Sequence, residues 1–163
     1  KPDVAIVDYA DILKPTTFYK EKRHSTGETY ENLRGMAGEF DIPIWTASQA
    51  NRSSLEEEVI DASKVSEDYS KVMTADFVMS ISRKVEDKIA NTGRVHVIKN
   101  RFGIDGITFP AEINTNTGLI QVHEASTYAG KEAQGKMNNS EEYLRKTLAK
   151  KYNDLSPKTD GFE

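Results

Sequence analysis

The chain has 163 residues, a formal net charge of −4, and 37% hydrophobic and 9% aromatic residues. This length accommodates one domain, or one domain with an appendage, and supplies enough apolar side chains for a core. The absence of cysteine excludes disulfide frameworks and thiolate metal sites, and the net charge restricts phosphate binding to local basic patches. No run is long enough for a membrane span and no signal peptide precedes the first strand, so we expect a cytoplasmic protein.

The first half of the chain predicts two short buried strands separated by a helix. Residues 4–7 are an apolar run that ends at Asp8, as a buried parallel strand does when it presents a carboxylate at its C-terminal edge. The spacing of Ser and Glu at 25–28 is that of a capping box, and apolar residues at helical spacing follow it. A second apolar strand at 44–47 runs into Ser-Gln-Ala-Asn-Arg at 48–52.

The second half predicts two further strands and a hairpin. An acidic segment at 53–71 precedes the strands, and a polar turn at 84–93 separates them. The predicted strands and hairpin lie at 75–81, 95–98 and 107–122. The fourth strand ends in Lys-Asn-Arg-Phe-Gly at 99–103. This order indicates an α/β fold with a mainly parallel sheet and an antiparallel C-terminal hairpin.

The composition changes after Glu124 to Ala, Gly, Lys, Gln, Asn and Ser, which is typical of a linker. Ser140 can cap an amphipathic C-terminal helix, and the residues after it are expected to be a loose end. We therefore predict a core domain at 1–124 and a linker with an appended helix at 125–163. The run Gly130 to Met137 fits the phosphate-loop pattern except at its last residue, where Met has no hydroxyl for Mg²⁺, and we interpret it as a chance match.

Four motifs in a fixed order carry a resemblance to a known family. They are IVDYADIL, the helix leading into IPIWTASQANR, the strand TADFVMSISR, and VHVIKNRFG. Over about residues 3–122 they resemble the C-terminal part of the RecA-type motor of DnaB-family replicative helicases, in particular the phage T-even-like branch. The pair S-Q-x-N-R and K-x-R-x-G, in this order, makes the resemblance specific. It implies a partial RecA-like (P-loop NTPase) core that lacks its Walker A half, within a hexameric, ATP-dependent DNA helicase of a bacterial or phage-infected cell.

The resemblance also implies a role for individual residues. Asp8 would be the Walker B carboxylate that holds Mg²⁺ through water beside ATP, and Gln49 would sense the γ-phosphate. Lys99 and Arg101 lie two apart on an extended segment and so point the same way; they would reach the γ-phosphate of a neighbouring subunit. Arg83 would line the adenine pocket. Each role has a structural alternative. Asp8 can be an ordinary acid at a strand end, and Gln49 can be a strand-end amide whose hydrogen bonds are satisfied. The cations Lys99, Arg101 and Arg83 can simply be exposed at strand ends.

The family translocates on single-stranded DNA, and two regions of this chain match its DNA-contacting parts. The expected DNA-binding residues are basic or polar and follow the first two strands: Lys20, Lys22, Arg23, Asn51 and Arg52. For the region that contains Lys20, Lys22 and Arg23, the alternative is a solvated loop that does not bind DNA. The segment 53–71 occupies the position of the family's main DNA-contacting loop, but Ser66-Glu67-Asp68 replaces the family's Arg-Glu-Ser, so its arginine is absent.

Without the phosphate loop and the catalytic glutamate of the family, we expect the isolated chain to be inactive. A helicase loader or a primase is an expected partner of the parent protein. Two alternatives remain, a RecA-type recombinase core and a non-catalytic RecA-like interaction module. In a RecA-type sheet the phosphate-loop strand lies between the strands at 44–47 and 77–82, so we also expect a gap there, which self-association of the chain would cover.

Overall fold

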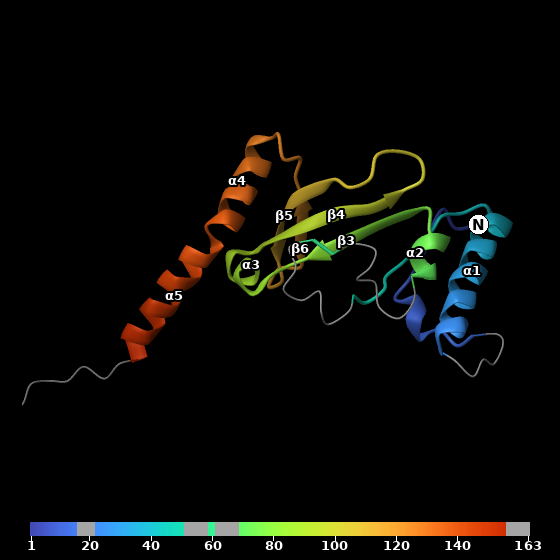
Figure 1. Cartoon of the computed structure of the whole chain (residues 1–163), viewed down its shortest axis with the longest axis horizontal. Helices are drawn as coiled ribbons and strands as arrows, with labels where there is room; N and C mark the ends of the chain where they lie inside the picture. Colours follow the sequence, from blue (N-terminus) through green and yellow to red (C-terminus); the bar gives the residue numbers. More distant parts are fainter. Residues whose placement is uncertain (16–21, 51–58, 61–68, 156–163) are drawn as a thin grey trace, which may run out of the picture. The chain divides into compact units, whose positions relative to one another are not determined.

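The computed structural model describes residues 1–15, 22–50, 59–60 and 69–155, and it confirms the α/β fold class (Figure 1). A short 3-10 helix, η1, follows the first strand. The elements are, in chain order, β1 (Ala5–Val7), η1 (Ala10–Ile12), α1 (Lys22–Phe40), β2 (Ile44–Thr46), α2 (Ser70–Thr74), β3 (Phe77–Ser82), α3 (Val85–Ala90), β4 (Thr92–Asn100), β5 (Thr108–Asn114), β6 (Leu119–Val122), α4 (Tyr128–Asn138) and α5 (Ser140–Leu155).

The strands form two separate sheets. β1 and β2 pair in parallel, with Ala5 opposite Ile44 and Val7 opposite Thr46. The second sheet has the order β3-β4-β5-β6, and β5 and β6 form the predicted antiparallel hairpin, closed by a turn in which Gly118 has a φ of +72°. A positive φ of this kind is accessible to glycine at little cost. The expected parallel and antiparallel parts of the fold are therefore both present.

The chain divides into two compact units, of which the first comprises residues 1–82 and 96–108. Here α1 contacts η1, β2 and α2. The buried side chains Ala10, Tyr30 and Val72 come from η1, α1 and α2 respectively, so this small core lies beside the C-terminal ends of β1 and β2. These ends are where the sequence places its first candidate site residues.

The second unit comprises residues 83–95 and 109–163. Its core is formed by Val95, Ala111 and Ile113, with Phe109 packed against them. The carboxylate of Asp87 is buried at the start of α3 and accepts a hydrogen bond of 2.6 Å from Arg94 Nη1, which neutralises its charge. The expected division of the chain at residue 124 remains a prediction.

Three local expectations were wrong. α1 begins at Lys22, so Ser25 lies inside the helix and not at its N-cap; Lys22 and Arg23 are good helix formers and extend it. The polar turn expected at 84–93 contains α3, whose C-cap residue, Asn91, is in the left-handed conformation.

The linker expected after residue 124 is also wrong, because it contains α4. The hydroxyl of Thr127 caps this helix by accepting a hydrogen bond from Gly130 N, and Ala133 and Met137 are buried along it. Gly130 is required here because a Cβ at this position would lie 1.9 Å from the carbonyl oxygen of Glu124. The run resembling a phosphate loop is thus a helix, in agreement with its interpretation as a chance match.

Candidate functional site

The C-terminal edge of the β1–β2 sheet brings two of the predicted site residues together. Asp8 directly follows β1 and its side chain is exposed. Gln49 follows β2, and its amide nitrogen donates a long hydrogen bond of 3.4 Å to the hydroxyl of Tyr9. Because the two strands are parallel and in register, Asp8 and Gln49 lie at the same edge of the sheet. Asp8 presents an exposed carboxylate there, and Gln49 bonds Tyr9, the residue that follows Asp8.

A buried polar network lies beside this edge. Lys71 Nζ is 2.9 Å from Asp11 Oδ1, and their side chains are only 2% and 12% exposed. Tyr30 donates a hydrogen bond of 2.8 Å to Asp11 Oδ1, and Ser48 donates one of 2.9 Å to Asp11 Oδ2. Lys71 also donates to Ser48 Oγ at 3.1 Å and lies over the ring of Tyr30. The network joins η1, α1, the end of β2 and α2.

The protonation of this network follows from its contacts. Burial alone would raise the pKa of Asp11, but hydrogen bonds from Lys71, Tyr30 and Ser48 outweigh burial and lower it. Burial and the neighbouring Asp11 carboxylate raise the pKa of Tyr30 well above its usual value. Asp11 is therefore held as a carboxylate and Tyr30 as a neutral phenol that donates to it.

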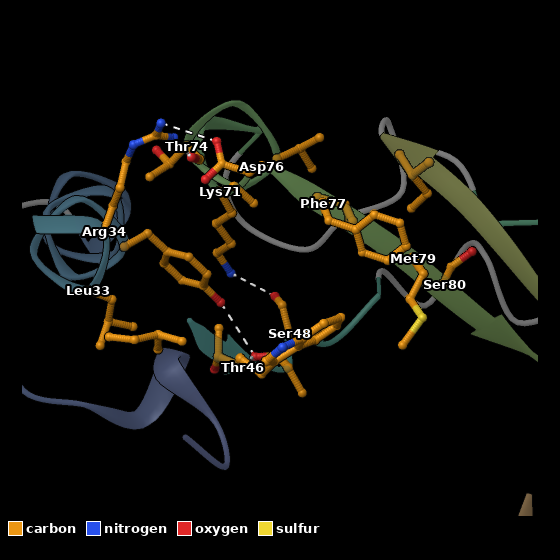
Figure 2. A pocket seen from close by; sticks show the side chains of 18 of the residues that line it. Leu33, Arg34, Thr46, Ser48, Lys71, Thr74, Asp76, Phe77, Met79 and Ser80 are labelled. Atoms are coloured by element: carbon orange, nitrogen blue, oxygen red, sulfur yellow. Dashed lines mark hydrogen bonds and ion pairs between the residues drawn. The ribbon is translucent and has the colours of Figure 1, made fainter. Parts of the chain in front are cut away.

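A cavity of about 750 Å³ lies in the first unit, between β2 and β3 (Figure 2). Side chains of α1, β2, α2 and β3 line it, and most of them are apolar. Trp45 of β2 and Phe77 of β3 meet in this region in an edge-to-face contact, with ring centroids 6.0 Å apart. Figure 2 shows Lys71 directed toward Ser48 on one side of the cavity and Arg34 directed toward Asp76 on another.

Lys99 and Arg101 lie together, as predicted from their spacing, but they contact their own chain. Lys99 Nζ donates hydrogen bonds of 2.9 and 2.8 Å to the carbonyl oxygens of Val72 and Met73 in α2. Arg101 donates to the Met73 carbonyl at 3.2 Å and forms an ion pair of 3.1 Å with Asp76. Burial and the adjacent Arg101 lower the pKa of Lys99. The pair is therefore not a free basic strand end.

Arg83 lies in the second unit, where its guanidinium donates hydrogen bonds to backbone carbonyls. Nε donates to the Thr92 oxygen at 3.0 Å, and Nη2 lies 3.5 Å from the Lys88 oxygen near the end of α3. A role in an adenine pocket stays a prediction. Of the expected DNA-binding residues, Lys20, Asn51 and Arg52 lie outside the described residues. Lys22 and Arg23 are the first two residues of α1, and their side chains also lie outside that description.

Sequence reasoning missed the residues that connect these groups, namely Tyr30, Asp11, Ser48, Lys71, Arg34 and Asp76. Three of them lie within motifs already identified: Asp11 is the second acid of DYAD, Ser48 precedes Gln49, and Asp76 is the acid of TADFVMSISR. The other connections depend on α2, whose packing has no signature in the sequence. Among the residues that the structure describes, no group of three or more His, Asp or Glu side chains can hold a metal ion, and no helix there is long and apolar enough to cross a membrane.

Comparison with known proteins gives one sequence relative and several structural neighbours. No family model matches the chain. It is 30% identical over 105 residues to the DnaB-like replicative helicase of Enterobacteria phage T4, an alignment that spans 63% of this chain and 22% of the relative. The chain thus covers about a fifth of the length of the curated relative that it matches.

Two solved structures share its fold. One is described as an ATPase domain and the other as a DnaB-like replicative helicase with its interactions with primase, each at a TM-score of 0.65 and 20% identity. Each match covers 74% of this chain, and 44% and 30% of the respective neighbours. The chain therefore shares part of the fold of these two solved structures, and the resemblance to DnaB-family replicative helicases carried by the four motifs is confirmed by the sequence relative.

Proposed function

We propose that the chain is the C-terminal part of the ATPase domain of a ring-forming replicative helicase, which uses ATP and Mg²⁺ to translocate on single-stranded DNA. The observation that carries the proposal is the similarity over 105 residues to a DnaB-like replicative helicase, together with Asp8 and Gln49 at one sheet edge. A primase, suggested by the description of one structural neighbour, or a helicase loader is the proposed protein partner.

The residues present fit one part of a magnesium nucleotide site. Asp8 is an exposed carboxylate at the C-terminal end of a parallel strand, and a single carboxylate that binds through water suits Mg²⁺. When bound, the metal supplies charge neutralisation for a transferring phosphoryl group. Gln49, at the end of the neighbouring strand, is proposed to respond to the nucleotide through its uncharged amide. Since the sequence contains no G-x-x-x-x-G-K-S/T motif to cradle the phosphates, this chain alone should show no ATPase activity above background.

Lys99 and Arg101 are proposed to act on ATP bound by a neighbouring subunit. Their cationic groups suit the charge that develops on a transferred γ-phosphoryl group, and an arginine in this role contributes roughly 10³- to 10⁵-fold to turnover. Arg101 is exposed, so it can leave its intramolecular contacts for a neighbour. This arrangement requires two subunits for each active site.

The test uses the complete helicase that carries this chain. Arg101→Ala should leave nucleotide binding nearly intact and lower ATP turnover by about 10³-fold or more, whereas Arg145→Ala on the exposed face of α5 should have no effect. Mixing Arg101→Ala with Asp8→Asn subunits should restore part of the turnover, because some interfaces then combine two intact halves. Failure of every mixing ratio to restore activity would contradict catalysis across an interface.

A further inference from the structure

The turn that carries Asp8 is joined to β2 by the hydroxyl of Thr46. Thr46 is the last residue of β2 and lies directly opposite Val7, the last residue of β1. Its Oγ1 donates a hydrogen bond of 2.9 Å to the Val7 carbonyl and accepts one of 2.9 Å from the Ala10 amide. Asp8 and Tyr9 are therefore held between two backbone groups that bond the same side chain.

The chemistry of the hydroxyl suits both of these bonds. A threonine hydroxyl has one proton to donate, and the Val7 carbonyl is nearer to Oγ1 than the Ala47 carbonyl, which is 3.4 Å away. Ala10 is only 1% exposed, so its amide needs an acceptor within the protein, and Thr46 supplies it. A valine at position 46 has a similar shape but can form neither bond.

The residue after this turn is anchored to the same end of β2. Asp11 accepts a hydrogen bond of 2.9 Å from Ser48, two residues after Thr46, and it also forms the buried ion pair with Lys71. The backbone is thus held on both sides of Asp8, whereas the Asp8 side chain itself is exposed. The direction of the Asp8 carboxylate is therefore set by the backbone that Thr46 holds.

We propose that Thr46 is a positioning residue for Mg²⁺, because its hydroxyl fixes the turn from which the Asp8 carboxylate binds the metal through water. The inference rests on the proposed function and adds to it a residue that touches neither the metal nor the nucleotide. Mg²⁺ requires near-ideal octahedral geometry, and groups that orient its ligands affect metal affinity strongly. Thr46 acts only through Asp8 in this scheme, which distinguishes it from a residue that merely stabilises the fold.

Amide hydrogen exchange in the 163-residue chain, followed by NMR, tests the contact itself. Thr46→Val should accelerate exchange at the Ala10 amide about tenfold or more, whereas Thr46→Ser keeps the hydroxyl and should leave the rate near the wild-type value. The matched control is Thr108→Val on β5, an equally half-buried threonine whose hydroxyl bonds His96; it should leave Ala10 unchanged. An Ala10 amide that exchanges at the wild-type rate in Thr46→Val would overturn the proposal.

Binding of a fluorescent ATP analogue to the complete helicase that carries this chain tests the positioning role. Thr46→Val should raise the Mg²⁺ concentration for half-maximal binding roughly tenfold, and Thr46→Ser and Thr108→Val should not. Asp8→Asn should also raise it, and adding Thr46→Val to Asp8→Asn should cause no further rise, because Thr46 acts through Asp8. Thr46→Ala removes the hydroxyl without adding a methyl group, and it should give the same rise if the valine variant does not fold.

The outcomes separate the positioning role from the proposed function. A wild-type Mg²⁺ dependence in Thr46→Val or Thr46→Ala, together with faster exchange at Ala10, would overturn the positioning role and leave the hydroxyl with a role in folding only. An additive rise in the double variant, or a serine variant that behaves as the valine variant does, would overturn it as well. If Asp8→Asn itself keeps the wild-type Mg²⁺ dependence, the proposed function fails at its metal site, and the role of Thr46 fails with it.

Discussion

Replacing Lys71 by Met should be among the most destabilising substitutions in the first unit. Met keeps the length and apolar stem of the side chain, but it leaves the Asp11 carboxylate with Tyr30 and Ser48 as its only described donors. Because the two charged side chains are only 2% and 12% exposed, water cannot replace the lost ammonium group. Removing one partner of a buried ion pair costs roughly 3–5 kcal/mol, a large part of the 5–15 kcal/mol that typically stabilises a domain.

Urea unfolding of Lys71→Met, Asp11→Asn and the double variant measures this cost. Asp11→Asn should lose roughly 2–4 kcal/mol, and the double variant should lose about 2 kcal/mol less than the sum of the two, because the unpaired charge is no longer buried. Lys136→Met is the matched control, since its ion pair with Glu112 is about half exposed and should contribute less than about 1 kcal/mol. Strictly additive effects at Lys71 and Asp11 would refute the buried ion pair.

Three further predictions concern other parts of the chain. The pKa of Asp11 is lowered in the folded state, so the Asp11 carboxylate contributes fully to stability at a pH above its ordinary pKa near 3.8. This contribution is lost as the pH falls below that value. Acid unfolding followed by circular dichroism should show the loss in the wild type and not in Asp11→Asn. Gly130→Ala should cost roughly 2 kcal/mol or more because its Cβ would clash with the Glu124 carbonyl, whereas Gly135→Ala, with open space around it, should stabilise α4 by about 0.5–1 kcal/mol; equal shifts in urea midpoints would contradict this packing. Deleting residues 140–163 should lower the melting temperature by roughly 4 °C, because α5 contacts α3 and α4, and an unchanged melting temperature would mean that α5 serves a partner instead.

The strands could be predicted from the sequence because each is a short apolar run with a polar motif at its end. β1 and β2 match their expected bounds within a residue at either end, and the hairpin follows from the alternation around its Asn- and Gly-containing turn. α3 and α4 could not be predicted in this way. Their segments are polar, and their helical structure is fixed by capping and by burial of a few side chains, such as Asp87 and Met137, against the rest of the second unit.

The candidate site could be predicted only where it consists of strand ends. Asp8 and Gln49 follow parallel neighbouring strands, so their proximity follows from the topology. The intramolecular contacts of Lys99 and Arg101 could not be foreseen, because they depend on the position of α2, a helix of five residues that follows a polar segment. A spacing of two residues indicates that two side chains share a direction, but it does not indicate what they meet there.

The gap expected between β2 and β3 is present among the described residues. Within the part of the chain that the structure describes, β2 pairs with β1 and β3 pairs with β4, and β2 and β3 do not pair with each other. The cavity of about 750 Å³ lies between β2 and β3. Unpaired backbone groups at strand edges that face such a gap are templates for another strand. The two strands have not closed up to pair directly, which leaves self-association as the expected way to cover these edges in the isolated chain.

Light scattering should therefore show association of the 163-residue chain that increases with concentration. Trp45, the only tryptophan, lies on β2 beside the cavity, so its fluorescence should change over the same concentration range. Trp45→Lys places a charge at this edge and should shift the chain toward monomer, because a charged edge discourages strand pairing, whereas Tyr152→Lys on the exposed side of α5 should not. A chain that stays monomeric at all concentrations, with unchanged Trp45 emission, would mean that these edges are not templates for a strand. The inferred place of a missing strand between β2 and β3 would then lose its support.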